Sequence, residues 1–197
     1  PYTLAMMASD LLGLLDLLDI SRVHLCGVSM GGMISQNLAI AAPERVASLA
    51  LVNTTCKYDT DQVQGWQDRA SLVESEGITP LYDMLMMRWF TEAAAKNRIP
   101  GYCYMENCLK RFKPEAFTAV SAAISNLDTT TELARLEMPR IVIATKDDPG
   151  VPTATSELMA QQLGVEPQWI GPAQHLATLE HPKIFNRIIR VFLLGVV

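Results

Sequence analysis

One serine stands in a glycine-rich setting that is suited to nucleophilic chemistry. Residues 27–31 read Gly-Val-Ser-Met-Gly, and the pattern G-x-S-x-G lies between an apolar run and a predicted helix. A sharp strand-to-helix turn of this kind holds the serine hydroxyl, here that of Ser29, above the end of a strand. There the backbone N–H of Met30 can donate to a developing oxyanion. The alternative is a plain glycine-rich turn in which Ser29 only caps the next helix.

A serine nucleophile needs a base, and the sequence offers three histidines. His24 lies inside an apolar run and is more typical of a satisfied core histidine. His181 precedes a proline at the start of the last predicted helix and is typical of a helix-terminal residue. His175 lies in a loop after the last predicted strand, where an imidazole can reach the carboxyl edge of a sheet. We therefore expect His175 to be the base.

The carboxylate that orients the base is expected from a pair of aspartates. Asp147 and Asp148 directly follow an apolar run and precede Pro-Gly-Val-Pro at 149–152. A loop at the carboxyl end of a strand is the right place for such an acid. Both aspartates are also turn formers, and one of them can cap the next helix. The order along the chain is then serine, aspartate, histidine.

Apolar runs that alternate with helical periods predict the elements that must position these residues. Helices are expected over 3–19, 30–41, about 153–163 and 181–194. The apolar runs are typical of buried parallel strands and lie at 23–27, 46–52 and 140–145, with a weaker one at 167–170. Strands and helices in this alternation predict an α/β fold with a mostly parallel sheet and helices on both faces.

The interval 61–127 interrupts this rhythm, because it predicts several helices with no strand between them. It holds eight of the thirteen aromatic residues, namely Trp66, Tyr82, Trp89, Phe90, Tyr102, Tyr104, Phe112 and Phe117. This concentration of aromatic residues is typical of a helical cap that covers an apolar pocket. It fits an ordinary helical subdomain with its own core equally well. Its seven Lys and Arg residues against eight Asp and Glu residues neither favour nor exclude an anionic substrate. The sequence thus divides into core parts at 1–60 and 128–197 and a cap at 61–127.

Composition limits the partners and the compartment. With 197 residues, 49% of them hydrophobic, the chain can bury one substantial core. A net charge of −5 without a basic block argues against nucleic acid as a partner, and no apolar run reaches the roughly 20 residues that span a membrane. The four cysteines form no CxxC pair, and no cluster of His, Cys and carboxylates has metal-ligand spacing. We therefore expect no metal, no cofactor and a cytoplasmic protein.

Several short segments carry a resemblance to a known family. They are 27–33, 43–46, the Arg-Trp-Phe-Thr stretch at 88–91, 101–103, 142–149 and 175–180. Together with the order serine, aspartate, histidine, which differs from the two common orders of serine proteases, they resemble the α/β-hydrolases. The cap segments favour a narrower resemblance, to the 3-oxoadipate enol-lactonases. The resemblance runs from about residue 2 to the C-terminus.

The resemblance implies an α/β-hydrolase fold with a helical cap. It implies a serine hydrolase of aromatic catabolism that cleaves a small lactone or ester through an acyl-enzyme, and it leaves a homo-oligomer open. It also implies that Asp148, the second of the pair, orients His175. Trp66 corresponds to a cap tryptophan that faces the substrate in similar enzymes, and Trp89, in a matched cap segment, is expected to bind substrate as well.

In similar enzymes four strands precede the helix expected at 3–19, and the loop after the third strand supplies a second oxyanion donor. That region is not in this sequence. We therefore expect a fragment, or one part of a split or processed enzyme, in which a missing N-terminal segment or a second chain completes the sheet. Loss of one oxyanion donor typically costs about 10²–10³-fold in turnover, so the isolated piece is expected to be nearly inert.

Two alternatives to a lactonase stay open, one of them an enzyme and the other a protein without catalytic activity. A carboxylesterase or a cofactor-free perhydrolase would need the same serine, aspartate and histidine. A catalytically inactive ligand-binding module on this fold also stays open, because a fold does not determine a function. The complete set of three residues argues against such a module.

Overall fold

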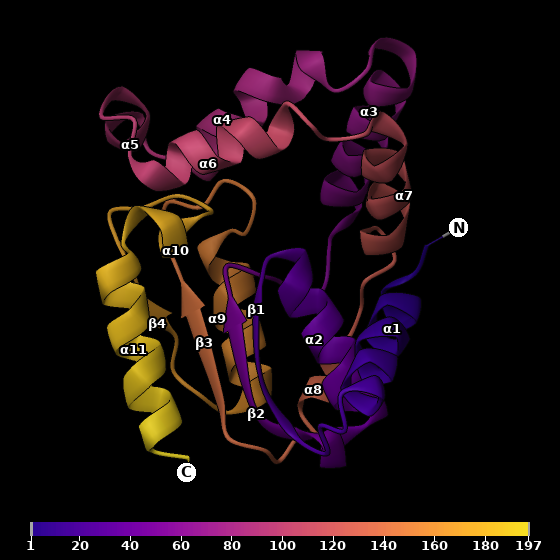
Figure 1. The fold of residues 1–197 in the computed structure, drawn as a ribbon, viewed down its shortest axis with the longest axis vertical. Coiled ribbons are helices and arrows are strands. Elements are labelled where there is room, and N and C mark those ends of the chain that lie inside the picture. Colours follow the sequence, from indigo (N-terminus) through magenta and orange to yellow (C-terminus); the bar gives the residue numbers. More distant parts are fainter. Residues whose placement is uncertain (1, 197) are drawn as a thin grey trace.

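A parallel β-sheet forms the base of the molecule (Figure 1). The computed structural model describes residues 2–196. Within this range four strands pair in the order β1-β2-β3-β4, all of them parallel. They are β1 Val23–Val28, β2 Val46–Val52, β3 Arg140–Ala144 and β4 Gln168–Trp169. Each expected strand is therefore present, and the one expected at 167–170 is the shortest.

Helices cover both faces of the sheet. On one face lie α1 Leu4–Leu17, α2 Met30–Ala41, α8 Thr130–Leu133 and α9 Thr153–Leu163, whose apolar side chains share one core cluster with the strands. The short helix η1 Pro43–Arg45 leads into β2. On the other face, α11 Pro182–Leu194 packs Phe185, Ile188 and Ile189 against strand residues, with α10 Ala177–Glu180 before it. The predicted parallel sheet with helices on both faces is confirmed.

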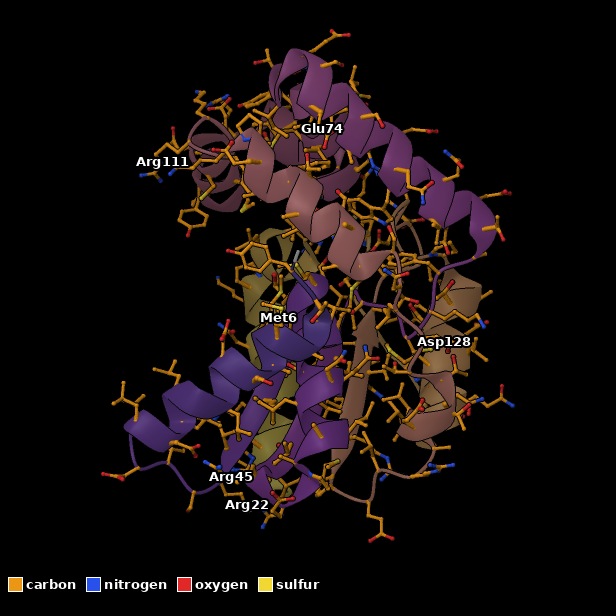
Figure 2. The ribbon with its side chains drawn as sticks, turned by 90° about the vertical axis from the view of Figure 1, so that its right-hand side faces the viewer. Met6, Arg22, Arg45, Glu74, Arg111 and Asp128 are labelled. Atoms are coloured by element: carbon orange, nitrogen blue, oxygen red, sulfur yellow. The ribbon has the colours of Figure 1, made fainter. Side chains whose placement is uncertain are left out.

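The helix α1 begins and ends at residues that explain its limits. Thr3 caps it, because its hydroxyl accepts a hydrogen bond from the N–H of Met6. At the other end the Arg45 guanidinium lies 2.7 Å from Asp16 Oδ1 and donates to the carbonyl of Ser21 at 2.8 Å. Figure 2 shows Arg45 at the end of the sheet opposite the cap. These contacts fix the turn that leads from α1 into β1.

Strand β1 differs from its expected burial. Leu25 and Gly27 are buried, whereas His24 and Cys26 are exposed. The expectation of a buried strand, with His24 in the core, is therefore wrong. Successive residues of a strand face opposite sides, and α2 packs against only one side of β1. His24 keeps one polar contact, since its Nδ1 lies 2.8 Å from the hydroxyl of Ser48 on β2.

A group of helices lies over the carboxyl ends of the strands and forms the cap (Figure 1). It comprises α3 Thr60–Glu76, η2 Thr79–Leu81, α4 Tyr82–Trp89, α5 Glu92–Lys96, α6 Pro100–Leu109 and α7 Pro114–Ile124. The cap has its own apolar cluster, with Phe90 2% exposed. Glu74 and Arg111 lie at its outer end (Figure 2). Where the chain enters and leaves the cap, Lys57 Nζ and Asp128 Oδ2 form an ion pair of 2.7 Å.

The apolar helices are short. Among the described residues, no helix combines the length and the apolar character needed to cross a membrane.

Candidate active site

Ser29 occupies a strained turn between β1 and α2. Its φ of 54° and ψ of −122° lie in a region that non-glycine residues rarely adopt. Hydrogen bonds hold it there, because its N–H donates to the carbonyl of Val52 at 3.0 Å and its own carbonyl accepts from the Thr54 hydroxyl at 2.7 Å. The strain lifts the serine side chain out of the sheet, as the G-x-S-x-G pattern predicts.

Two of the glycines around Ser29 leave no room for a side chain. A Cβ at Gly27 would overlap the carbonyl of Gly31, and one at Gly32 would overlap the side chain of Thr54. Around Gly31, by contrast, the described residues leave open space. The close packing of strand against helix at Gly27 and Gly32 is therefore what permits the turn.

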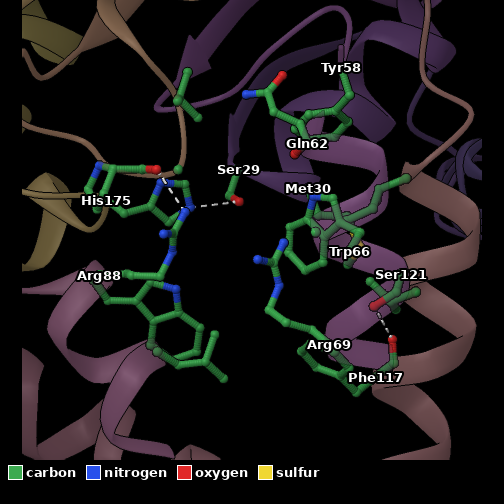
Figure 3. A pocket seen from close by; sticks show the side chains of 18 of the residues that line it. Ser29, Met30, Tyr58, Gln62, Trp66, Arg69, Arg88, Phe117, Ser121 and His175 are labelled. Carbon is green, nitrogen blue, oxygen red and sulfur yellow. Dashed lines mark hydrogen bonds between the residues drawn. The ribbon is translucent and has the colours of Figure 1, made fainter. Parts of the chain in front are cut away.

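The side chains of Ser29, His175 and Asp148 form one continuous chain of hydrogen bonds. Ser29 Oγ lies 2.8 Å from His175 Nε2, as the dashed line in Figure 3 marks. His175 Nδ1 lies 2.7 Å from Asp148 Oδ2. Ser29 follows β1, Asp148 follows β3 and His175 lies in the loop after β4, so the parallel sheet brings three distant segments to one edge. This geometry is that of a nucleophile, a base and an orienting acid.

Asp148 is 4% exposed and is surrounded by donors. Besides His175, it accepts from Asn53 Nδ2 at 3.0 Å and from the N–H groups of Gly150 at 2.7 Å and Val151 at 3.1 Å. Burial opposes ionisation, but the hydrogen bond and charge of His175, with the other donors, outweigh it and hold the pKa of Asp148 below its ordinary value. The neighbouring Asp147 is exposed to solvent, and the hydrogen bond to His175 belongs to Asp148.

Asn53 is a polar member of this site that the sequence analysis missed. It directly follows β2, has a φ of 42° and donates to both Asp148 and the Thr145 hydroxyl. Its place just after a buried strand, at the same edge as the other groups, is the signal that could have identified it.

The backbone N–H of Met30 lies next to Ser29 and is free to donate a hydrogen bond. Met30 is the first residue of α2, so its N–H has no acceptor within the helix. Met30 also lines the cavity beside Ser29 (Figure 3). Its role in catalysis stays a prediction.

A cavity of about 470 Å³ lies between Ser29 and the cap. Both predicted tryptophans, Trp66 and Trp89, line it, and their role in substrate binding stays a prediction. One wall is aromatic, because the Trp66 ring lies 6.4 Å from that of Tyr58 and 6.2 Å from that of Phe117. Burial raises the pKa of Tyr58 to about 12, so this wall is uncharged near neutral pH. Such a cavity suits a small, largely apolar molecule.

Two arginines of the cap also reach the cavity, and the sequence analysis did not select them. Arg69 of α3 and Arg88 of α4 enter it from opposite sides (Figure 3). The Arg69 guanidinium lies 4.3 Å from the ring centroid of Trp66, and Arg88 donates to the carbonyl of Pro149 at 2.7 Å. Burial, and then the positive charge of Arg88, lower the pKa of Arg69. No sequence signal selects them, because which face of each cap helix meets the cavity depends on how the cap packs on the sheet edge.

Over residues 2–196, no group of three or more His, Cys, Asp and Glu side chains is arranged to hold a metal ion.

Comparison with known sequences places this architecture in a family. A family model described as alpha/beta hydrolase fold matches residues 1–182. The chain is 30% identical over 189 residues to 3-oxoadipate enol-lactonase 2 of Acinetobacter baylyi, a match that covers 96% of this chain and 70% of the relative.

Solved structures agree with the sequence match. A hydrolase from Pseudomonas aeruginosa PA01 superposes with a TM-score of 0.91 and 31% identity, over 98% of this chain and 72% of that one. The enol-lactonase from Burkholderia xenovorans LB400 gives a TM-score of 0.91 and 28% identity, over 98% and 74%. The parallel sheet, the strained serine turn and these matches together show that the chain belongs to the α/β-hydrolase family.

Proposed function

We propose that this protein is a serine hydrolase that opens a small lactone or ester through an acyl-enzyme. The observation that carries the proposal is the hydrogen-bonded chain from Ser29 through His175 to Asp148, which ends at a largely apolar cavity. The similarity to enol-lactonases supports a lactone as the substrate.

In the first half of the reaction, Ser29 Oγ attacks the carbonyl carbon while His175 Nε2 takes the hydroxyl proton. Asp148 holds the imidazole in the required tautomer and stabilises the imidazolium. The oxyanion accepts a hydrogen bond from the Met30 N–H. The bond from the carbonyl carbon to the ring oxygen then breaks, and His175 returns its proton to the leaving oxygen. In an enol-lactone this oxygen leaves as an enol that becomes a ketone, so its expulsion is easy.

In the second half, water releases the product from Ser29. His175 Nε2 takes a proton from the water as its oxygen attacks the acyl carbon, and the bond to Ser29 Oγ breaks when the proton returns to it. The same side chains thus serve both halves, and neither half requires a metal or an organic cofactor.

The two arginines favour a lactone that carries a carboxylate. Arg69 and Arg88 bring two positive charges to one cavity, and among the described residues neither forms an ion pair. Two acids, Asp59 and Asp61, also line the cavity. Asp59 caps α3 by accepting from the N–H of Gln62, and Asp61 is exposed to solvent. Burial, and then the positive charge of Arg88, lower the pKa of Arg69, and a bound carboxylate would offset the second of these causes. The arginines therefore support an anionic lactone over a neutral ester.

The test compares three substrates on the full-length natural protein: an enol-lactone with a carboxylate, its methyl ester and p-nitrophenyl acetate. We expect the highest kcat/KM on the carboxylate-bearing lactone. An Arg69→Met variant should raise KM for that lactone by about 10- to 100-fold, because a charged hydrogen bond is lost, and should leave KM for p-nitrophenyl acetate nearly unchanged.

The catalytic part of the proposal is tested by Ser29→Ala, which should lose turnover of all three substrates. Ser9→Ala, on the exposed side of α1, is the matched control and should keep it. Retained turnover in Ser29→Ala would remove Ser29 from its role. Equal rates on charged and neutral substrates would favour the carboxylesterase alternative.

A further inference from the structure

A partly buried carboxylate joins the histidine loop to the cap. Glu180, the last residue of α10, uses both of its oxygens. Oε1 accepts from the backbone N–H of Gln174 at 2.8 Å, directly before His175. Oε2 accepts from the N–H of Thr91 at 3.1 Å and from its hydroxyl at 2.6 Å. Glu180 thus links the loop of the base to the segment that follows α4 in the cap.

Backbone hydrogen bonds run along the same junction. The N–H of Leu176 donates to the carbonyl of Trp89 at 3.0 Å, and that of His175 approaches the carbonyl of Arg88 at 3.4 Å. The Gln174 side chain faces the carbonyls of Met87, Arg88 and Phe90, to which it would donate once its amide nitrogen is turned toward the cap. The loop that carries the imidazole is therefore bonded along its length to the cap segment that carries two cavity residues, Arg88 and Trp89.

We infer that Glu180, with Thr91 as its partner in the cap, is a positioning residue for His175. Glu180 does not line the cavity, so it acts through the loop and not on the substrate. This role rests on the proposed function, in which His175 is the base.

The proposed reaction requires the His175 imidazole to be placed precisely beside the Ser29 hydroxyl. The hydrogen bond of 2.8 Å between Ser29 Oγ and His175 Nε2 requires the loop backbone to be held in place. The loop follows the short β4, which pairs with β3 through two residue pairs. The carboxylate of Glu180 supplies the loop with charge-assisted hydrogen bonds, which are shorter and stronger than neutral ones. Misplacement of a catalytic group by about 1 Å can cost on the order of 10²-fold in rate.

Glu180→Gln breaks one arm of this link, because an amide nitrogen must face either the Gln174 N–H or the Thr91 donors. We expect kcat and the rate of Ser29 labelling by a fluorophosphonate to fall by about 10- to 100-fold, with KM changed less than about threefold. Thr91→Val, which removes only the hydroxyl arm, should lower both rates by about 3- to 10-fold, and Thr91→Ser should restore them.

The double variant separates this role from a local one. Thr91 also caps α5, since its hydroxyl accepts from the N–H of Ala94 at 3.2 Å, and that loss is the same in both backgrounds. If Thr91 acts through Glu180, Thr91→Val should add little in the Glu180→Gln background. Glu106→Gln is the matched control, because Glu106 pairs with Arg98 at 3.0 Å elsewhere in the cap, and it should leave kcat unchanged.

Hydrogen exchange gives a readout that does not require Ser29 to react. The amides of Gln174 and Leu176 should exchange faster in Glu180→Gln and in Thr91→Val than in the natural protein. If exchange rises but the natural protein is not labelled at Ser29, the proposed function fails and the link between cap and loop stands. Unchanged kcat and unchanged exchange in Glu180→Gln, or fully additive effects of the two substitutions, would overturn the inference.

Discussion

At the scale of single residues, the site depends on how Asp148 is held. Its carboxylate accepts four hydrogen bonds, from His175, Asn53 and two backbone N–H groups, and these outweigh the burial that opposes its charge. The lowered pKa of Asp148 keeps its carboxylate ionised near neutral pH, as the proposed mechanism requires of the group that orients His175. An ionised acceptor at His175 Nδ1 leaves Nε2 free to act as the base toward Ser29.

Asp148→Asn is predicted to lower kcat by about 10³- to 10⁴-fold. The Asn oxygen can still accept from Gly150 and Val151, but its nitrogen then faces His175 Nδ1, which favours the tautomer that carries its proton on Nε2. That tautomer cannot take the proton of Ser29. Asp147→Asn is the control, because Asp147 is exposed, and it should keep kcat. Steady-state kinetics of both variants at neutral pH decide the point.

The same substitution has a signature in stability. Because the folded-state pKa of Asp148 is lowered, its charge stabilises the fold above the ordinary carboxyl pKa, and this contribution is lost as pH falls through the lowered value. The free energy of unfolding of the natural protein should therefore exceed that of Asp148→Asn by the largest amount at neutral pH. The difference should shrink when denaturant titrations are repeated at increasingly acidic pH, and a difference that grows toward acid would contradict this.

At the scale of elements, the junction of β1 with α2 determines whether Ser29 can adopt its strained conformation. Gly27 on β1 meets the backbone at Gly31, and Gly32 meets Thr54, which in turn donates to the Ser29 carbonyl. The G-x-S-x-G pattern requires glycine both two residues before and two residues after the serine, but in the structure only the first of these glycines lacks room for a side chain. Space is limiting at Gly27 and Gly32, and open at Gly31.

Gly27→Ala is accordingly predicted to abolish most activity and to destabilise the fold by about 1–3 kcal/mol or more, because the added methyl must displace backbone. Gly31→Ala adds a methyl group in open space on a helix, where alanine is favoured over glycine by up to about 1 kcal/mol. It should fold at least as well and keep Ser29 reactive. Thermal unfolding and the rate of ester hydrolysis of the two variants test this, and equal damage in both would show that the contrast is wrong.

The elements themselves could be predicted from the sequence to the extent that their burial is regular. The largely apolar run of β2 and the proline after α2 predict the correct limits, since the structure has β2 at Val46–Val52 and α2 at Met30–Ala41. The prediction that His24 lies in the core is wrong. Whether helices cover both faces of a strand depends on the position of the strand in the sheet, which the local sequence does not determine.

The convergence of Ser29, Asp148 and His175 could be predicted, because each follows a predicted strand and has a chemically distinctive side chain. Asn53 follows the same rule but is too common a turn residue to stand out. Arg69, Arg88 and Glu180 could not be selected, because their positions depend on how the cap packs on the sheet edge.

At the scale of the whole molecule, the cap and the sheet each have an apolar cluster, and a further cluster joins α1 and α2 to α3 and α7 beside the cavity. The cap cluster includes Phe90 and Leu85, whereas the sheet clusters include Leu49 and Ile143. Leu176 of the histidine loop and Leu179 of α10 pack against the cap cluster. The base of the proposed mechanism is thus held between the two parts, so its position depends on how they pack together.

The most direct test of this account is the site at which a fluorophosphonate bonds to the natural protein. The Oγ of an activated serine displaces fluoride from phosphorus, and mass spectrometry of proteolytic peptides locates the adduct. The account predicts one adduct, on Ser29, absent in Ser29→Ala and formed at least about 10³-fold more slowly in His175→Ala. No adduct on Ser29, or labelling of Ser29 at the same rate without the His175 imidazole, would contradict it.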